Sequence, residues 1–106
     1  MILNGKTKED FKEWVFENYY FQDLNVLYPL HLVDTLIIEF FDSVGIYIYL
    51  ETGTYLNKPN FIYKIITNDD TCIGYKEYSR QESTIQAITK ANEIYNVLYS
   101  KQKQVK

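Results

Sequence analysis

The sequence predicts an α+β domain in the order helix, helix, three strands, helix, with the helices on one face of a three-stranded antiparallel sheet. Two observations predict this class. Apolar residues recur at helical spacing in three segments, 7–20, 29–45 and 79–99. Between the last two of these segments the spacing changes to two over residues 46–51, and further short apolar runs follow at 61–67 and 71–78.

The first helix is predicted to begin at Thr7 and to end near Tyr20. Thr7 and Asp10 stand three residues apart, as in a capping box, where side chains bind the free N–H groups at the start of a helix. The apolar stripe expected to face the core comprises Phe11, Trp14, Val15 and Tyr19.

The second helix is predicted to run between two residues typical of helix ends. Pro29 suits the first helical position, where its missing N–H is not needed. Gly45 suits a left-handed cap after the last turn. Apolar residues cover more than one side of this segment, so we expect a central helix buried on more than one face. Those residues are Leu30, Leu32, Val33, Leu36, Ile37, Ile38, Phe40, Phe41 and Val44.

The sheet is predicted from three short runs. In the first run, residues of an aliphatic side alternate with residues of a tyrosine side. The aliphatic side comprises Ile46, Ile48 and Leu50, and the tyrosine side comprises Tyr47, Tyr49 and Glu51. Residues 52–60 contain Gly53 and Pro59 and are predicted to form a loop. Strands at 61–67 and 71–78 then form a hairpin around a turn at 68–70.

The last helix has the strongest local signal in the chain. Ser79 and Glu82 form a complete capping box at its start. Its apolar stripe comprises Ile85, Ile88, Ala91, Tyr95, Leu98 and Tyr99. The 106 residues are expected to form one domain, with 1–6 and 101–106 flexible.

Composition excludes several classes of protein. With 46% hydrophobic residues the chain can bury one core, and a net charge of −3 argues against wrapping duplex nucleic acid. The apolar stretch 24–44 is interrupted by charged residues, so no membrane span or signal peptide is expected. A single cysteine, Cys72, permits no internal disulfide. These features predict a cytoplasmic protein.

No catalytic, cofactor or metal site is predicted. His31 and Asp34 are three residues apart on the second helix, but no nucleophile in a recognisable motif completes the pair. Asp69 and Asp70 are too few ligands for a cation and are typical of a turn. The glycines are isolated, without a phosphate-binding pattern. We therefore expect a protein that is not an enzyme.

Eleven tyrosines point instead to a binding surface. If the aliphatic side of the first strand faces the core, Tyr47 and Tyr49 face outward. In the hairpin, Phe61, Tyr63 and Ile65 are expected to share a face with Ile73 and Tyr75. Ile62, Lys64 and Ile66 are expected to share the other with Cys72 and Lys76. Both faces are partly apolar, so which one continues the tyrosine side stays open, and the candidate partner-binding residues are Tyr47, Tyr49, Tyr63 and Tyr75.

Three interpretations of these tyrosines remain. They can serve only as good strand formers, they can form a homo-oligomer or partner interface, or they can stack single-stranded RNA. The third requires basic surroundings that the chain lacks.

Four segments, 4–7, 40–45, 79–82 and 91–96, resemble parts of small proteins carried by phages and mobile elements of Bacteroidetes-type bacteria. The resemblance implies an accessory protein that acts on a host system as a stoichiometric inhibitor, as anti-CRISPR proteins do. The expected partner is then a host protein or nucleoprotein complex, such as a nuclease or defence complex. The alternative is a small nucleic-acid-binding regulatory module that uses the sheet tyrosines and the basic tail.

Overall fold

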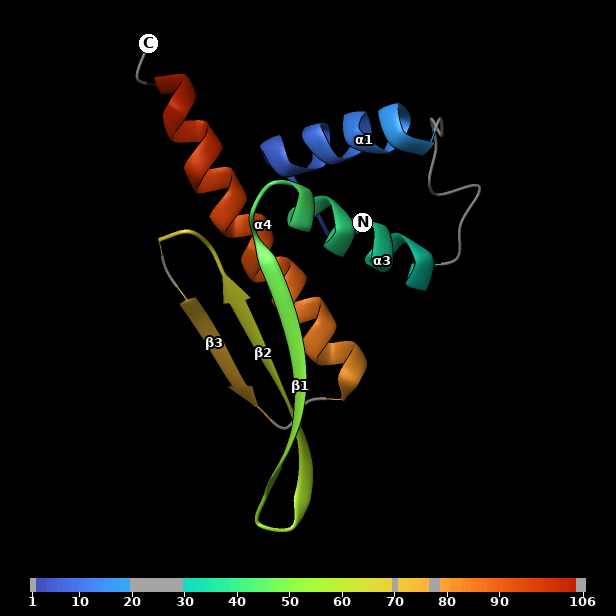
Figure 1. Ribbon diagram of the computed structural model, residues 1–106, viewed down its shortest axis with the longest axis vertical. Coiled ribbons are helices and arrows are strands. Elements are labelled where there is room, and N and C mark those ends of the chain that lie inside the picture. Colours follow the sequence, from blue (N-terminus) through green and yellow to red (C-terminus); the bar gives the residue numbers. More distant parts are fainter. Residues whose placement is uncertain (1, 20–29, 70, 77–78, 105–106) are drawn as a thin grey trace.

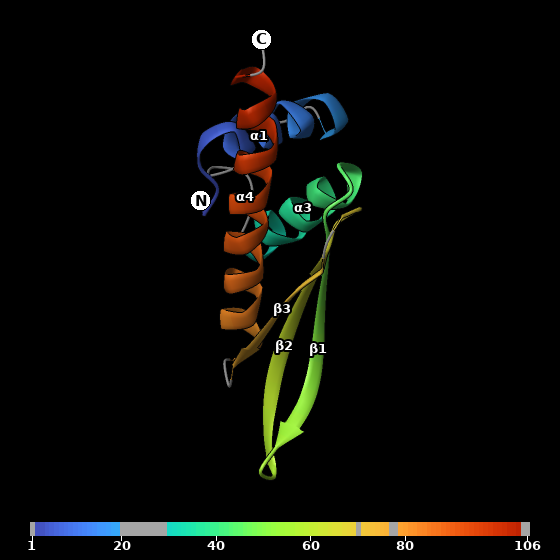
Figure 2. The same cartoon turned by 90° about the vertical axis from the view of Figure 1, so that its left-hand side faces the viewer.

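The computed structural model describes residues 2–19, 30–69, 71–76 and 79–104, and it confirms the predicted α+β class (Figure 1). Within these residues the sheet has the order β1-β2-β3, antiparallel throughout. The helices lie on one side of the sheet, with α4 along it (Figure 2). The elements in chain order are α1 (Gly5–Tyr19), α3 (Leu30–Ser43), β1 (Tyr47–Tyr55), β2 (Lys58–Ile66), β3 (Thr71–Lys76) and α4 (Arg80–Gln104).

The core lies where α1, α3 and α4 meet above the sheet. Phe40 of α3 is its centre, with ring centroids 5.7 Å from Phe11, 5.8 Å from Trp14 and 5.6 Å from Tyr95. Edge-to-face and tilted contacts of this kind are favourable between aromatic rings. The buried residues of α3 recur at helical spacing along one stripe, so among its described side chains the predicted burial on more than one face is not observed; they are Val33, Leu36, Ile37, Phe40 and Phe41.

The end of α3 forms as the sequence predicts. Gly45 adopts a left-handed backbone, with φ of 82°. Its N–H donates to the carbonyl of Asp42 at 3.2 Å, and the N–H of Ile46 donates to that of Phe41 at 2.9 Å. This pair of bonds is the Schellman motif, completed by the buried side chains of Phe41 and Ile46. Pro29, the predicted start, lies outside the described residues.

The predicted capping box of the first helix is wrong. The helix begins at Gly5, and Thr7 lies inside its first turn, fully buried. The N–H and the hydroxyl of Thr7 both donate to Oδ1 of Asn96 at 3.0 Å. Asp10 instead accepts a hydrogen bond of 2.6 Å from the hydroxyl of Tyr95. The first turn of α1 is therefore capped by side chains of α4, which are distant in the sequence.

Asn4 completes this connection between α1 and α4. Its N–H donates to Oδ1 of Asn92 at 3.1 Å, and its own Oδ1 accepts from Nδ2 of Asn92 at 3.0 Å and of Asn96 at 2.9 Å. Residues 4–7 and 92–96 thus form one network, which we call the asparagine network. It joins parts of the chain up to 92 residues apart.

The predicted loop at 52–60 is also wrong, because β1 and β2 continue through it. Gly53 pairs with Asn60 and Thr54 with Pro59, and Leu56 and Asn57 alone form the turn. Since β3 ends opposite Phe61, the ribbon beyond that point has two strands and projects from the molecule (Figure 1). We call residues 53–60 the arm. Pro59, which has no backbone N–H to donate, is tolerated there because no third strand of the described sheet pairs with this part of β2.

The start of the last helix is confirmed, and its stripe is confirmed in part. Oγ of Ser79 accepts a hydrogen bond of 3.2 Å from the N–H of Glu82. Ile88 and Tyr95 are buried as expected, together with Ala91. Ile85, near the start of the helix, and Leu98, in its last third, are instead exposed.

Candidate protein-interaction surface

The sheet has one face without helices, which we call the open face. Directly opposed residues of an antiparallel sheet share a face. The observed register therefore places three cross-strand rows on the open face: Tyr47–Ile66–Thr71, Tyr49–Lys64–Ile73 and Glu51–Ile62–Tyr75.

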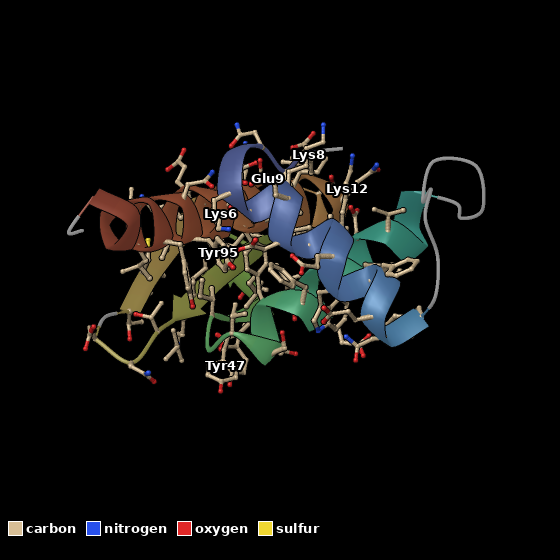
Figure 3. All side chains as sticks on the ribbon, turned by 90° about the horizontal axis from the view of Figure 1, so that it is seen from above. Lys6, Lys8, Glu9, Lys12, Tyr47 and Tyr95 are labelled. Carbon is tan, nitrogen blue, oxygen red and sulfur yellow. The ribbon has the colours of Figure 1, made fainter. Side chains whose placement is uncertain are left out.

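Large apolar side chains of the open face reach solvent. Tyr47, Tyr49 and Ile73 are 41%, 48% and 41% exposed. Figure 3 shows Tyr47 pointing outward at the edge of the molecule, whereas Tyr95 lies among the helices. The neighbouring Ile46 is buried in the core. The predicted outward placement of Tyr47 and Tyr49 is thus confirmed, while of Tyr75 the structure describes only the strand position.

Tyr63 lies on the opposite face, because it pairs with Leu50, which alternates with Tyr49 along β1. The predicted grouping of Tyr63 with Ile73 and Tyr75 is wrong by one residue. Tyr63 pairs with Gly74, and Ile65 pairs with Cys72 on the helix side. Tyr63 is partly buried against the core, and its ring fills the space in which a Cβ of Gly74 would lie. The tyrosines proposed as one surface are therefore divided: Tyr47, Tyr49 and Tyr75 belong to strand positions of the open face, and Tyr63 packs inside.

The charges described on the open face balance one another. Nζ of Lys64 lies 3.9 Å from Oε1 of Glu51, and both side chains are partly exposed. Such an exposed pair contributes less than about 1 kcal/mol to stability. The positive charge of Lys64 is balanced by the negative charge of Glu51, so the part of the open face between the exposed tyrosines and Ile73 carries no net charge.

The arm adds an apolar tip that the sequence analysis missed. Leu56 and Asn57 both have left-handed backbones, with φ of 52° and 64°. Two-residue hairpins require this geometry and are usually built with Asn or Gly. The side chain of Leu56 is 79% exposed. No Asn-Gly pair marks this turn, which is why Gly53 and Pro59 suggested a loop.

The titratable side chains of the described part of the chain are dispersed. That part contains no group of three His, Cys, Asp or Glu side chains that could hold a metal ion. Cys72 is a free, half-buried thiol on the helix side of β3. Burial, and then the hydrogen bond to Asp10, raise the pKa of the Tyr95 hydroxyl far above its ordinary value. The side chain of His31 and the whole of Asp70 lie outside the described residues.

Comparison with known proteins gives no family assignment. No family model matches the chain, and neither a curated protein nor a solved structure is significantly similar to it. Within the described residues, no helix combines the length and the apolar character needed to cross a membrane.

Proposed function

We propose that this chain is a non-enzymatic cytoplasmic protein that binds another protein through its open face and arm. The observation that carries the proposal is the exposure of Tyr47, Tyr49 and Ile73 together on a face without helices. Tyrosine supplies a large contact area and fixes only two side-chain torsions on binding. Exposed apolar side chains gathered on one face are typical of an interaction site.

The charge of this face favours a protein partner over a nucleic acid. Binding to phosphates depends on several unpaired Lys or Arg side chains. Among the described side chains of the open face, Lys64 is the only cation, and it is paired with Glu51. A neutral, aromatic surface instead resembles the centre of a protein interface, from which charges are depleted.

The tip of the arm supports the same proposal. A left-handed backbone costs a residue such as leucine about 1–2 kcal/mol. With 79% of its surface exposed, Leu56 recovers little of that cost within the folded chain. Insertion of Leu56 into an apolar pocket of a partner would provide the missing burial, worth about 1.5–3 kcal/mol for a leucine.

Binding without chemistry implies stoichiometric action. We propose that the protein occupies a functional surface of its target, and that the target is a nuclease or defence complex of a bacterial host. This target class follows from the resemblance of residues 4–7, 40–45, 79–82 and 91–96 to phage and mobile-element proteins. The exposed side chains of the open face support binding to a target surface as the mode of action. Capture experiments identify the target.

The experiment is affinity capture from host lysate, with and without nuclease treatment, followed by measurement of affinity for the captured protein. The double variant Tyr47→Ala/Tyr49→Ala should weaken binding by about 2 kcal/mol or more, which is about 30-fold. Phe16→Ala is the matched control, because Phe16 is an equally exposed aromatic residue on α1 (47%). Equal affinity of both variants for the partner would refute the assignment to the open face.

A second variant separates binding from folding. Leu56→Asn should raise the thermal midpoint, because asparagine tolerates the left-handed conformation, and should weaken partner binding at the same time. A variant that is more stable and binds normally would show that the arm tip takes no part. Loss of the captured partner on nuclease treatment would favour the alternative, a nucleic-acid-binding module.

A further inference from the structure

β1 forms one edge of the described sheet, where it pairs with β2 alone (Figure 1). Natural edge strands are usually protected by proline, a bulge or charged side chains. β1 is nine residues long, contains no proline and keeps a continuous register with β2. Its single charged residue is Glu51, at the centre of the strand. Within the part of the chain that the structure describes, this edge therefore lacks the usual protection.

The turn of the arm determines which backbone groups of β1 point away from β2. It is a two-residue turn, so the flanking pair Tyr55–Lys58 exchanges both of its backbone hydrogen bonds. Bonded and non-bonded pairs alternate along an antiparallel ladder. Pro59 agrees with this alternation, because it lies opposite Thr54 in a non-bonded pair, where its missing N–H is not needed. The N–H and C=O groups that point outward therefore belong to Ile48, Leu50, Thr52 and Thr54.

A groove of about 590 Å³ borders β1 on the helix side, between α3 and the start of α4. Its apolar lining includes Ile38 of α3 and Leu50 of β1. Asp34 and Arg80 line it as well, so charges of both signs border it and a neutral side chain suits its centre. A strand added to β1 would thus find backbone partners along the edge and room for an apolar side chain beside Leu50.

We propose that an extended segment of the partner protein adds to β1 as a fourth, antiparallel strand of the sheet. Backbone hydrogen bonds to the outward groups of β1 supply affinity, and the groove selects an apolar side chain opposite Leu50. This inference rests on the proposed function in that a protein partner supplies the segment, and it adds the conformation and the chemistry of what is bound.

Glu51 determines the charge of that segment. Its side chain lies on the open face and is 56% exposed, and its contact with Lys64 is long, at 3.9 Å. Opposite charges directly across two strands stabilise the pair, so the segment carries Lys or Arg opposite Glu51. A second copy of the chain suits the edge less well. The antiparallel register that pairs the whole of β1 with itself sets Glu51 opposite its own copy, and like charges in that position are destabilising.

Amide hydrogen exchange followed by NMR tests the edge in the free protein. The amides of Ile48, Leu50 and Thr52 should exchange at least about tenfold faster than those of Tyr49 and Glu51, which bond to β2. Uniformly slow exchange would show that the edge is already covered and would overturn the proposal. Protection that appears only as the chain dimerises would assign the edge to a second copy and overturn it as well.

A peptide designed for this register tests the pairing. The probe is acetyl-Thr-Lys-Val-Thr-Val-Thr-amide, with its lysine opposite Glu51 and its first valine opposite Leu50. It should bind with a Kd of about 1 mM or lower and protect the amides of Ile48, Leu50 and Thr52. N-methylation of the first valine removes the donor to the Leu50 carbonyl and should weaken binding at least about tenfold. The matched control is N-methylation of the second threonine, whose N–H points away from β1, and it should be tolerated. Equal effects of the two, or no binding of the probe, overturn the strand addition.

The charge of the peptide tests the role of Glu51. Replacing the lysine of the probe by glutamate should weaken binding about fivefold, the upper range for a cross-strand charge pair. In the Glu51→Gln variant this preference for the lysine peptide should disappear. The same preference in the variant as in the unmodified chain overturns the charge assignment.

This inference and the proposed function can fail separately. A captured partner that needs Tyr47 and Tyr49 but leaves the amides of Ile48 and Leu50 unprotected would keep the proposed function and overturn the strand addition. A partner that protects these amides and binds Tyr47→Ala/Tyr49→Ala normally would support the strand addition and refute the assignment to the open face.

Discussion

Replacing Asn96 by alanine tests how α1 is held in the fold. Oδ1 of Asn96 accepts from the N–H and from the hydroxyl of Thr7, which is fully buried. The hydroxyl keeps a second acceptor, the carbonyl of Asn92 at 3.2 Å. The bonds that Nδ2 of Asn96 donates to Asn4 are exposed, so water can replace them. The substitution therefore leaves one buried group without a partner, the N–H of Thr7.

The expected loss follows from that single group. An unsatisfied buried donor costs about 1–3 kcal/mol, and loss of a helix N-cap costs about 0.5–2 kcal/mol. We expect Asn96→Ala to lower the free energy of unfolding by about 1–2 kcal/mol. At a urea dependence of about 1–2 kcal/mol per molar for a chain of this size, the midpoint falls by about 1 M.

Urea unfolding followed by circular dichroism measures this shift. Asn18→Ala is the control, because Asn18 is exposed and its Nδ2 donates to the carbonyl of Trp14 in its own helix, at 2.8 Å. Its midpoint should change little. Thr7→Val and Asn96→Ala should be non-additive, as expected for residues in contact. An unchanged midpoint for Asn96→Ala would show that α1 is stabilised by its apolar stripe alone.

Three further predictions concern the glycines and Tyr95. Gly45→Ala should cost about 1–2 kcal/mol in urea unfolding, because φ is 82° and no atom lies within 4 Å of the added Cβ, so the cost is that of the backbone alone. A loss of unfolding free energy below the roughly 0.5 kcal/mol typical of a surface substitution would contradict the Schellman motif at the end of α3. Gly74→Ala should cost about 1–3 kcal/mol, because the Tyr63 ring occupies the space of the new methyl group, and much less in a Tyr63→Ala background. Equal costs in the two backgrounds would exclude that contact. The fold raises the pKa of the Tyr95 hydroxyl. The protonated hydroxyl therefore contributes fully to the free energy of unfolding below the unfolded pKa of about 10, and this contribution is lost as the pH rises above that value. The thermal midpoint should therefore fall more between pH 8 and 10.5 in the wild type than in Tyr95→Phe, and equal falls would contradict this.

Features set by neighbours in the sequence could be predicted from it. The cap at Ser79 and the left-handed Gly45 depend on residues within five positions of each other, and both are observed. The alternation of Ile46 with Tyr47 likewise follows from strand geometry. This local information was sufficient to place Tyr47 and Tyr49 on the face away from the core.

Features that depend on distant contacts could not be predicted. The helix that begins at Gly5 is capped by Asn96, which no local pattern around Thr7 can indicate. The hairpin faces depend on the parity of the turn between Ile66 and Thr71, and one residue more or less moves every side chain to the other face. That parity is why Tyr63 and Tyr75 were expected to share a face, whereas their strand positions lie on opposite faces.

The asparagine network also has a consequence for the order of folding. Contacts between residues 85 to 92 positions apart are the most costly in chain entropy to form. During synthesis α1 leaves the ribosome before α4, whose side chains cap it. The first turn of α1 therefore has no cap until α4 has been translated, so this part of the fold cannot be completed before α4 is made.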